Sequence, residues 1–412
     1  MYDLLSGLRV VEAASFIAAP SCALHLAQLG AEVIRIDQAG GGPDFRRWPL
    51  SPGDGPSLYW EGLNKAKKSV ALDLSRPEGR ALAVQIITAP GKDAGLFVTN
   101  FPATGFLAYD RLTPHRPDLI CLRVMGWPDG RQAVDYTVNA AIGLPLITGP
   151  VGHPGPVNHV LPAWDLLAGA YASLCLVSAE RARRETGQGR EIRVPLSDIA
   201  IASLGHLGQI AEAQLTGQDR PRMGNDLFGA FGRDFATADG VRLMVVAITP
   251  RQWTGLVAIL GLDAAIASLE GELGADFSAD ESLRFVHRGR LNPMFEAAFA
   301  CKTAAELGPA FESRGVCWGP YQSLGQALAQ DRYFSAANPV LSPVEHPGGR
   351  TYLTPGAAAT IPGDARRPTP PAPVLGRDTE QVLAEVLGLS SGEIGRLHDA
   401  GLAVSAEKGV PL

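Results

Sequence analysis

The sequence predicts an α/β protein, with a large, doubly wound, Rossmann-like domain and a smaller α+β domain. Two observations predict the large domain: a strand–helix–strand pattern over residues 8–36, and its repetition up to residue 215. A third is a stretch at 216–225 rich in Gly, Arg, Asp and Pro, which indicates the start of another domain. A chain of 412 residues is also too long for one simple core.

The opening pattern predicts a βαβ unit. Residues 8–14 form a short apolar run, and Pro20 lies where a first helical turn would start. Residues 22–29 continue as a helix, which Gly30 closes. Residues 31–36 then predict a second buried strand, so the two strands should pair in parallel with the helix packed on the sheet.

The later elements are predicted in the same way from apolar runs and turn residues. In the large domain we expect strands at 69–74, 94–98, 119–125 and 191–194, and helices at 77–87, 164–184 and 197–214. In the smaller domain we expect strands at 235–237 and 241–247, and helices at 252–260 and 293–299.

The chain is expected to return to its first domain at the end. We assign residues 1–225 to the large domain and 226–325 to the small one, and expect 326–412 to complete the large domain. Within that last part, 338–375 is rich in Pro and Gly and predicts an extended arm, which two helices follow at 379–387 and 391–400.

Composition narrows the possible partners. The net charge is −6 and no basic stripe is present, which argues against nucleic acid. No apolar run reaches the length of a membrane span, and the first residues do not resemble a signal peptide, so we expect a cytoplasmic protein. The five cysteines are scattered without a CxxC pair, which predicts buried reduced thiols and no metal site.

The βαβ start also raises the question of a dinucleotide site. Asp37 lies where a ribose-binding acid would lie, but the turn after the first strand, 14–20, lacks the GxGxxG glycines that let a backbone approach a pyrophosphate. A GxSxG hydrolase motif is absent as well. Neither NAD binding nor an α/β-hydrolase is therefore favoured.

Asp165 is the most informative polar residue, because it stands at the start of the long predicted helix 164–184. An aspartate there commonly caps the helix. An ionised carboxylate at a helix N-terminus is also a workable nucleophile. Spacing alone leaves both interpretations open, and nearby His159 is most simply a satisfied surface or core histidine.

Taken together, several segments resemble the class III CoA-transferases, the family of formyl-CoA:oxalate CoA-transferase. The resemblance runs in order along essentially the whole chain. It is carried by 5–12, 29–37, 64–69, 72–74, 100–102, 164–165, 315–320 and 375–379.

The resemblance implies a site. Asp165 falls on the catalytic aspartate, which takes CoA as a covalent thioester. Contacts to CoA are implied for Ile17, Ala18, Leu72, Asn100, Phe101, Pro102, Asp135, Tyr136 and Arg46. A family arginine after the second strand is Gln38 here, so Arg46 or Arg76 is expected to replace it.

The resemblance also implies the partners. The substrates are an acyl-CoA thioester and a small dicarboxylate, and no tightly bound cofactor is expected. The protein partner is a second copy of the chain, in an interlaced homodimer. Stretches at 40–44, 47–49, 134–139, 158–165 and 229–235 point to members that move CoA between the two carboxyl groups of mesaconate.

Other activities stay open. One is intermolecular transfer of CoA to small mono- or dicarboxylic acids, and another is binding of a CoA ester without catalysis. Racemisation is disfavoured, because Val134 replaces a histidine that the family's racemases use as a second acid or base. Arg233 is expected to orient the free carboxylate, and backbone N–H groups near Asp165 or in the loop 224–229 are expected to hold the oxyanion.

Overall fold

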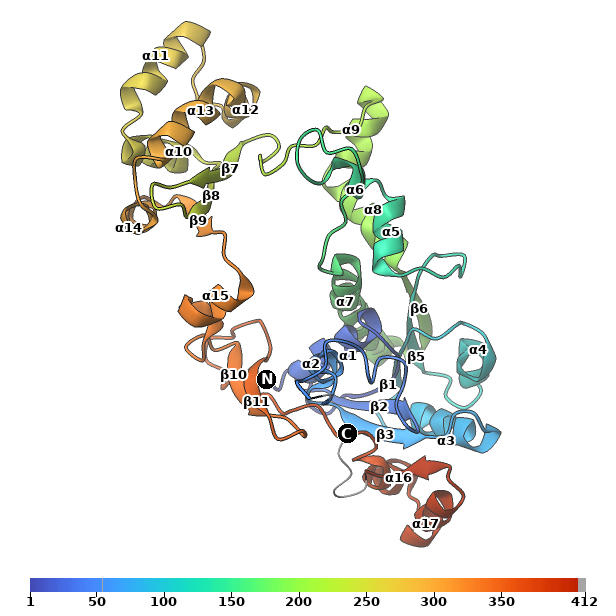
Figure 1. The fold of residues 1–412 in the computed structure, drawn as a ribbon. Coiled ribbons are helices and arrows are strands. Elements are labelled where there is room, and N and C mark those ends of the chain that lie inside the picture. The colour runs from blue at the N-terminus through green and yellow to red at the C-terminus, as the bar shows by residue number, and fades with distance from the viewer. Residues whose placement is uncertain (54, 407–412) are drawn as a thin grey trace. The chain divides into compact units, whose positions relative to one another are not determined.

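The computed structural model describes residues 1–53 and 55–406. The chain divides into two compact units, coloured along the sequence in Figure 1. The first unit comprises 1–142, 159–212 and 331–412, and the second comprises 143–158 and 213–330. The domain boundaries expected from the sequence, near 225 and 325, stay a prediction.

The first unit is built on a seven-stranded sheet in the order β12-β3-β2-β1-β4-β5-β6. Neighbouring strands from β3 to β6 are parallel, and only the last strand of the chain, β12, is antiparallel to its neighbour. The strands are β1 (Arg9–Ala13), β2 (Glu32–Gln38), β3 (Lys68–Leu72), β4 (Leu96–Thr99), β5 (Ile120–Met125), β6 (Arg190–Pro195) and β12 (Ala403–Val404). The predicted mixed α/β class is confirmed.

Helices connect the parallel strands, as the alternating pattern predicts. The helices of this unit are α1 (Ala18–Gln28), α2 (Leu58–Asn64), α3 (Pro77–Thr88), α4 (Tyr109–Leu112), α5 (Asp135–Ala141), α7 (Ala163–Thr186), α8 (Leu196–His206), α16 (Thr379–Leu387) and α17 (Ser391–Asp399). Two short 3-10 helices are also present, η1 (Gly105–Leu107) and η2 (Arg332–Phe334), and α9 (Gln209–Thr216) runs on into the second unit.

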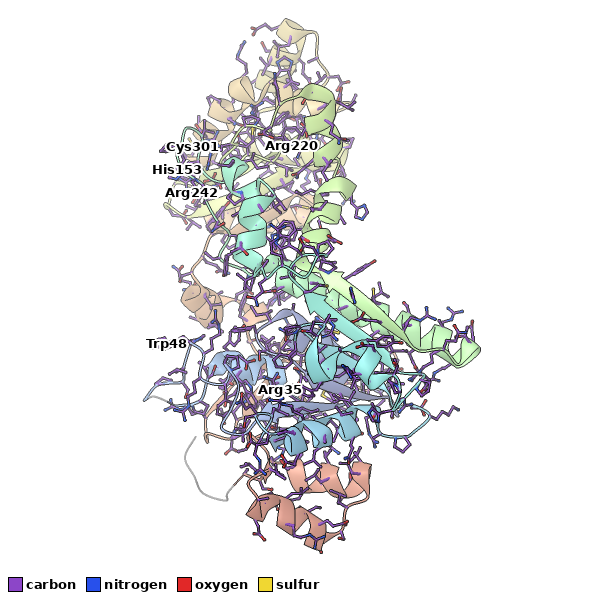
Figure 2. All side chains as sticks on the ribbon, turned by 90° about the vertical axis from the view of Figure 1, so that its right-hand side faces the viewer. Arg35, Trp48, His153, Arg220, Arg242 and Cys301 are labelled. Atoms are coloured by element: carbon purple, nitrogen blue, oxygen red, sulfur yellow. The ribbon has the colours of Figure 1, made fainter. Side chains whose placement is uncertain are left out.

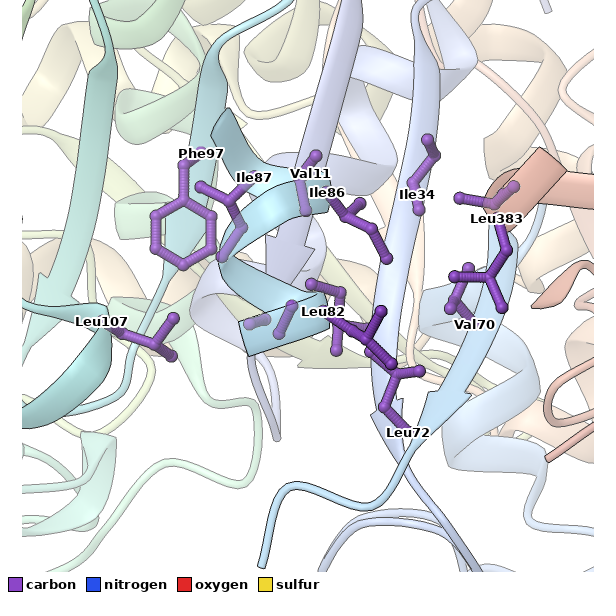
Figure 3. Close-up of a cluster of buried hydrophobic side chains, with 14 of the residues drawn as sticks. Val11, Ile34, Val70, Leu72, Leu82, Ile86, Ile87, Phe97, Leu107 and Leu383 are labelled. Atoms are coloured by element: carbon purple, nitrogen blue, oxygen red, sulfur yellow. The ribbon is translucent and has the colours of Figure 1, made fainter. Parts of the chain in front are cut away.

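One face of the sheet packs against α3, α16 and α17 (Figure 3). Side chains alternate across a strand, so β1 sends Val11 and Ala13 into this core. Ile86 of α3 and Leu383 of α16 meet them there, and both are fully buried. These contacts remove apolar surface from water, which stabilises the sheet. The carboxyl ends of its strands are thereby held in fixed positions.

The opposite face of β1 carries a buried ion network. Arg35 of β2 lies inside the first unit (Figure 2) and pairs with Glu12 at 2.8 Å, Asp37 at 2.7 Å and Asp44 at 3.4 Å. Lys67 adds a second cation, 2.6 Å from Glu12. Since each buried charge has a partner of opposite sign, the network fixes the loop that carries Asp44 against the sheet.

The second unit is a three-stranded antiparallel sheet covered by helices. Its strands are β7 (Phe231–Ala236), β8 (Arg242–Ala247) and β9 (Cys317–Pro320). Its helices are α6 (Leu144–Ile147), α10 (Pro250–Leu260), α11 (Asp263–Leu273), α12 (Glu281–Val286), α13 (Arg288–Phe299), α14 (Ala304–Arg314) and α15 (Leu324–Gln330). The core is aromatic: Phe235 stacks on Phe299 at 4.5 Å, and Phe231 packs against Phe295 at 4.6 Å.

Two predicted elements differ from the structure. The single helix expected at 197–214 is two helices, α8 and α9, because Gly208 between them has a φ of +77°, which a continuing helix does not accommodate. The arm expected at 338–375 contains a hairpin, β10 (Leu341–Glu345) paired with β11 (Thr351–Pro355). Pro343 and Pro355 in these strands hid the hairpin from the sequence pattern.

Candidate active site

The carboxyl ends of β1 and β4 meet at the point where the strand order reverses. The chain proceeds outward from β1 to β3 on one side and from β4 to β6 on the other. Ala13 and Thr99, the last residues of the two strands, pair with each other. In open parallel sheets such a reversal leaves a crevice outside the strand ends, where ligands bind.

The turn after β1 is held in an unusual conformation. Phe16 has a φ of +68°, which is uncommon for a residue with a side chain. Its backbone N–H donates to Asp44 at 3.0 Å. The neighbouring Ser15 bonds the side-chain amide of Asn100 through both its N–H and its carbonyl. The predicted contact residues that follow β1 and β4 are thereby brought together.

Two of those residues begin the first helix. Ile17 is the N-cap of α1, and the buried Ala18 is its first residue. Free backbone N–H groups at a helix start attract anionic groups. The exposed face of this turn therefore suits a phosphate or a carboxylate.

Asp165 lies in the first turn of α7 and is partly buried. One turn further on, Gly169 permits a close approach of α7 to α1, because a Cβ there would lie 1.9 Å from Ser21 Oγ and 2.7 Å from the Ala18 carbonyl oxygen. Residues four apart share one face of a helix, so Asp165 and Gly169 both face the side on which α1 packs. This geometry directs the carboxylate of Asp165 toward the start of α1.

Asp135 organises the N-terminus of α7. It is 1% exposed, and its Oδ2 accepts from the backbone N–H of Trp164 at 2.7 Å and of Asp165 at 3.3 Å. Its Oδ1 lies 2.6 Å from Nε2 of His159. The indole of Trp164 in turn donates to Asn139 at 3.1 Å. The helix cap is thus Asp135, a residue from α5, and the carboxylate of Asp165 is left free of that task.

The surroundings make Asp165 a weak acid. Burial raises its pKa to about 7, and the neighbouring charge of Asp135 adds to the shift. Desolvation and a like charge both disfavour an ionised carboxyl group. An aspartate with this pKa is ionised above neutral pH and is more basic, hence more nucleophilic, than an ordinary one.

Tyr59 is a neighbour that the sequence pattern did not indicate. Burial raises the pKa of Tyr59, and the charge of Asp165 contributes in the same direction. The guanidinium of Arg47 lies 5.4 Å from the centre of the Tyr59 ring and 5.5 Å from that of Phe16. The loop before α2 therefore belongs to the surroundings of Asp165. Its proximity to Asp165 can be recognised only from the tertiary structure.

The other predicted contact residues are spread more widely. Phe101 is 38% exposed and Pro102 is exposed, and the carbonyls of both accept from Arg123. Tyr136 is 42% exposed and donates to the carbonyl of Val160 at 3.2 Å. Leu72 is fully buried in the core beside α3, and its carbonyl already accepts from the backbone N–H groups of Ala39 and Leu74.

The arginines do not lie together. Arg46 lines a cavity of about 440 Å³ with Phe45, Trp60 and Glu61, and Arg76 donates to the carbonyl of Ala400. Arg233 belongs to the second unit, where it lies 3.3 Å from Glu296. The geometry within the first unit thus unites Asp165, Asp135 and the turn after β1, and leaves the partner of a ligand phosphate unassigned.

Within 1–53 and 55–406, no cluster of His, Cys, Asp and Glu side chains could hold a metal ion. Over the same residues, no helix is long and apolar enough to cross a bilayer.

Comparison with known proteins defines the class. Residues 5–379 match the model of CoA-transferase family III, and the chain belongs to this family. It is 48% identical, over 99% of its length and all of the relative's, to 2-methylfumaryl-CoA isomerase of Chloroflexus aurantiacus.

Two further proteins are similar over most of the chain. Succinyl-CoA:glutarate CoA-transferase of Homo sapiens is 27% identical, across 97% of this chain and 89% of the relative. Among solved structures, a CAIB/BAIF family protein from Brucella suis superposes with a TM-score of 0.75 at 22% identity, covering 94% of this chain and all of that one. That last likeness concerns the fold.

Proposed function

We propose that the protein moves CoA between the two carboxyl groups of mesaconate, the reaction of a 2-methylfumaryl-CoA isomerase. The observation that carries this proposal is the 48% identity to such an isomerase from Chloroflexus aurantiacus over nearly the whole of both chains. The free, weakly acidic carboxylate of Asp165 beside the turn after β1 supports it.

The first half-reaction moves CoA onto the enzyme. A carboxylate oxygen of Asp165 attacks the thioester carbonyl, and the C–S bond breaks to release CoA thiolate and leave a mixed anhydride. The thiolate then attacks the Asp165 carbonyl carbon. The anhydride C–O bond breaks, which gives an aspartyl-CoA thioester and free mesaconate dianion. Splitting the exchange retains the thioester's free energy.

The second half-reaction returns CoA to the other end of the acid. The second carboxylate of the same mesaconate attacks the aspartyl thioester and expels the thiolate. The thiolate attacks the mesaconyl carbonyl of the new anhydride, and Asp165 leaves as a carboxylate. No proton is gained or lost overall, so the site needs charge stabilisation and exclusion of water more than acid–base groups.

The CoA contacts are part of the proposal. Backbone N–H groups of Ile17 and Ala18 at the start of α1 would meet negative charge. Asn100, Phe101 and Pro102 would line the opposite wall after β4, with Asp135 and Tyr136 behind Asp165. Arg46 would pair with a CoA phosphate, and Leu72 would lie beside the ligand at the end of β3.

The test of intramolecular transfer is isotopic. Labelled free mesaconate is incubated with unlabelled mesaconyl-CoA and the enzyme, and the label in the product ester is measured over many turnovers. Retention of the acid between half-reactions predicts almost none. Label that equilibrates with the product would show an intermolecular transferase instead, the activity named for the human relative, and a screen of acceptor acids would identify its co-substrate.

We propose further that the protein is an interlaced homodimer of a doubly wound, Rossmann-like large domain and a smaller α+β domain. Support comes from α7, whose Leu167, Tyr171 and Leu174 are 44%, 51% and 61% exposed in the single chain. These residues follow the spacing of one helix face, and a second copy would cover them. Light scattering coupled to size-exclusion chromatography tests this, and the mass of one chain would contradict it.

A further inference from the structure

His159 is bound to the site although the reaction does not use it directly. Its Nε2 lies 2.6 Å from Oδ1 of Asp135, and its side chain is 25% exposed. The ring lies between two aromatic side chains, with its centre 5.9 Å from that of Tyr136 and 6.3 Å from the indole of Trp164. The imidazole is therefore held in one orientation, with one edge toward solvent.

The hydrogen bonds define which atom carries the proton. Oδ2 of Asp135 already accepts two backbone N–H groups, from Trp164 and Asp165, and this stabilises the ionised carboxylate. An ionised carboxylate only accepts, so the hydrogen between Oδ1 and Nε2 belongs to His159.

We propose that His159 is a positioning residue for the nucleophile: its N–H donates to Asp135 and fixes that carboxylate against the backbone of Trp164 and Asp165. This inference deepens the proposed function and rests on it, because it concerns the same carboxylate. The chain of contacts runs from His159 through Asp135 to the backbone nitrogen of Asp165.

The charge of Asp135 assists the chemistry for a physical reason. In the free enzyme, Asp165 and Asp135 are neighbouring carboxylates that repel each other. Formation of the anhydride or the thioester removes the charge of Asp165 and relieves this repulsion. The charge of Asp135 therefore favours the covalent adduct, and the hydrogen bond from His159 keeps that carboxylate in place.

The titratable groups around the pair are few. Toward His159, α5 presents Asp135 and Tyr136, and α7 presents Asp165. Tyr59 of α2 is a neighbour of Asp165, and the charges of Arg47 and Asp44 in the preceding loop also act on Tyr59. Of these groups, only Asp135 is in hydrogen-bond contact with His159 in the described part of the chain.

Two variants test the donor. His159→Gln keeps an N–H donor, and His159→Ala removes it. The exposed His115 of the same unit gives the matched control, His115→Gln. For each variant we would measure thermal unfolding, kcat and KM for mesaconyl-CoA from pH 5.5 to 9, and the rate at which the aspartyl-CoA adduct forms in a single turnover.

At pH 8, His159→Ala is expected to lower kcat and the adduct rate about tenfold or more at nearly constant KM, since a misplaced reacting group costs rate. His159→Gln should restore most of that rate. His115→Gln should match the wild type throughout.

The outcomes are distinguishable. Absence of an adduct in the wild type would refute the proposed function itself. If the wild type forms the adduct and His159→Ala forms it at the same rate, only the role of His159 is refuted. A glutamine variant as slow as the alanine variant refutes the donor role.

Discussion

The side-chain amide of Asn100 bonds Ser15 in both directions, accepting from its backbone N–H at 3.1 Å and donating to its carbonyl at 2.7 Å. The two residues follow β4 and β1, which are adjacent in the sheet but lie 85 residues apart in sequence. This pair of bonds holds the turn that contains the strained Phe16 and the start of α1 in one geometry.

Asn100→Ala should therefore loosen the wall of the CoA site. We expect kcat/KM for the CoA ester to fall about tenfold, mostly through KM, because each lost hydrogen bond to a buried backbone group costs about 1 kcal/mol or more. Asn338→Ala is the matched control, since Asn338 also bonds backbone groups, in the turn before β10. Equal KM values for wild type and Asn100→Ala would contradict the positioning role.

Asp165→Asn should remove turnover. The amide has nearly the same shape but is not a nucleophile, so we expect kcat to fall about a thousandfold or more, as when a covalent pathway is lost. Hydroxylamine trapping and mass spectrometry of enzyme mixed with mesaconyl-CoA should find the adduct on Asp165 in the wild type only. Asp198→Asn, in the first turn of α8, is the control. Full activity in the Asp165 variant would remove the nucleophile from the mechanism.

The pH profile of the wild type should show the weak acidity of Asp165. Only the ionised carboxylate attacks, and its pKa is raised to about 7, so kcat/KM should fall as the pH drops through neutrality. Enzymes that rely on an ordinary aspartate lose this activity only near pH 4. A profile that stays flat down to pH 5 is the contrary result.

Stability should change with pH in the opposite direction. The unfolded Asp165 has an ordinary pKa and the folded one a raised pKa, so the folded state binds more protons between about pH 4 and 7. The free energy of unfolding contributed by this group therefore falls as the pH rises through that window. Denaturant titrations at pH 5 and pH 8 should show that Asp165→Asn gains stability relative to the wild type at pH 8. No relative gain would contradict the raised pKa.

Gly169→Ala tests the contact between α1 and α7. A methyl group there meets Ser21 Oγ and the Ala18 carbonyl oxygen, so the helices must separate and carry Asp165 with them. We expect a loss of about 1–3 kcal/mol in the free energy of unfolding, together with a lower kcat. Gly289→Ala in α13 meets nothing within 4 Å and should be neutral or slightly stabilising. Similar melting temperatures for the two variants would rule out the clash.

The sequence predicted the parallel strands of the large sheet well, because these strands are continuous apolar runs such as 119–125, where β5 is found. Breaks within a helix or an extended segment were harder to predict from the sequence. Gly208 lies inside an apolar helical pattern, and only its backbone conformation breaks the helix. In the hairpin of β10 and β11, prolines at its strands concealed the pairing.

The site residues likewise differ in how far the sequence alone could identify them. Asp165 could be singled out because it begins a long helix. The identity of its cap could not, because Asp135 lies 30 residues earlier on α5 and reaches the helix start only through the fold. Tyr59 and His159 likewise belong to no local pattern, and their proximity depends on packing.

The edge of the large sheet next to β3 is completed from the far end of the chain. Ser69 and Ala71 donate their backbone N–H groups to the side chains of Asp378 and Thr379, and β12 pairs with β3 beyond them. A nascent chain must therefore expose this hydrogen-bonding edge throughout its synthesis, until its final helices have emerged from the ribosome. Protection of that edge by a chaperone during translation, or its pairing with another unfinished chain, becomes a determinant of yield.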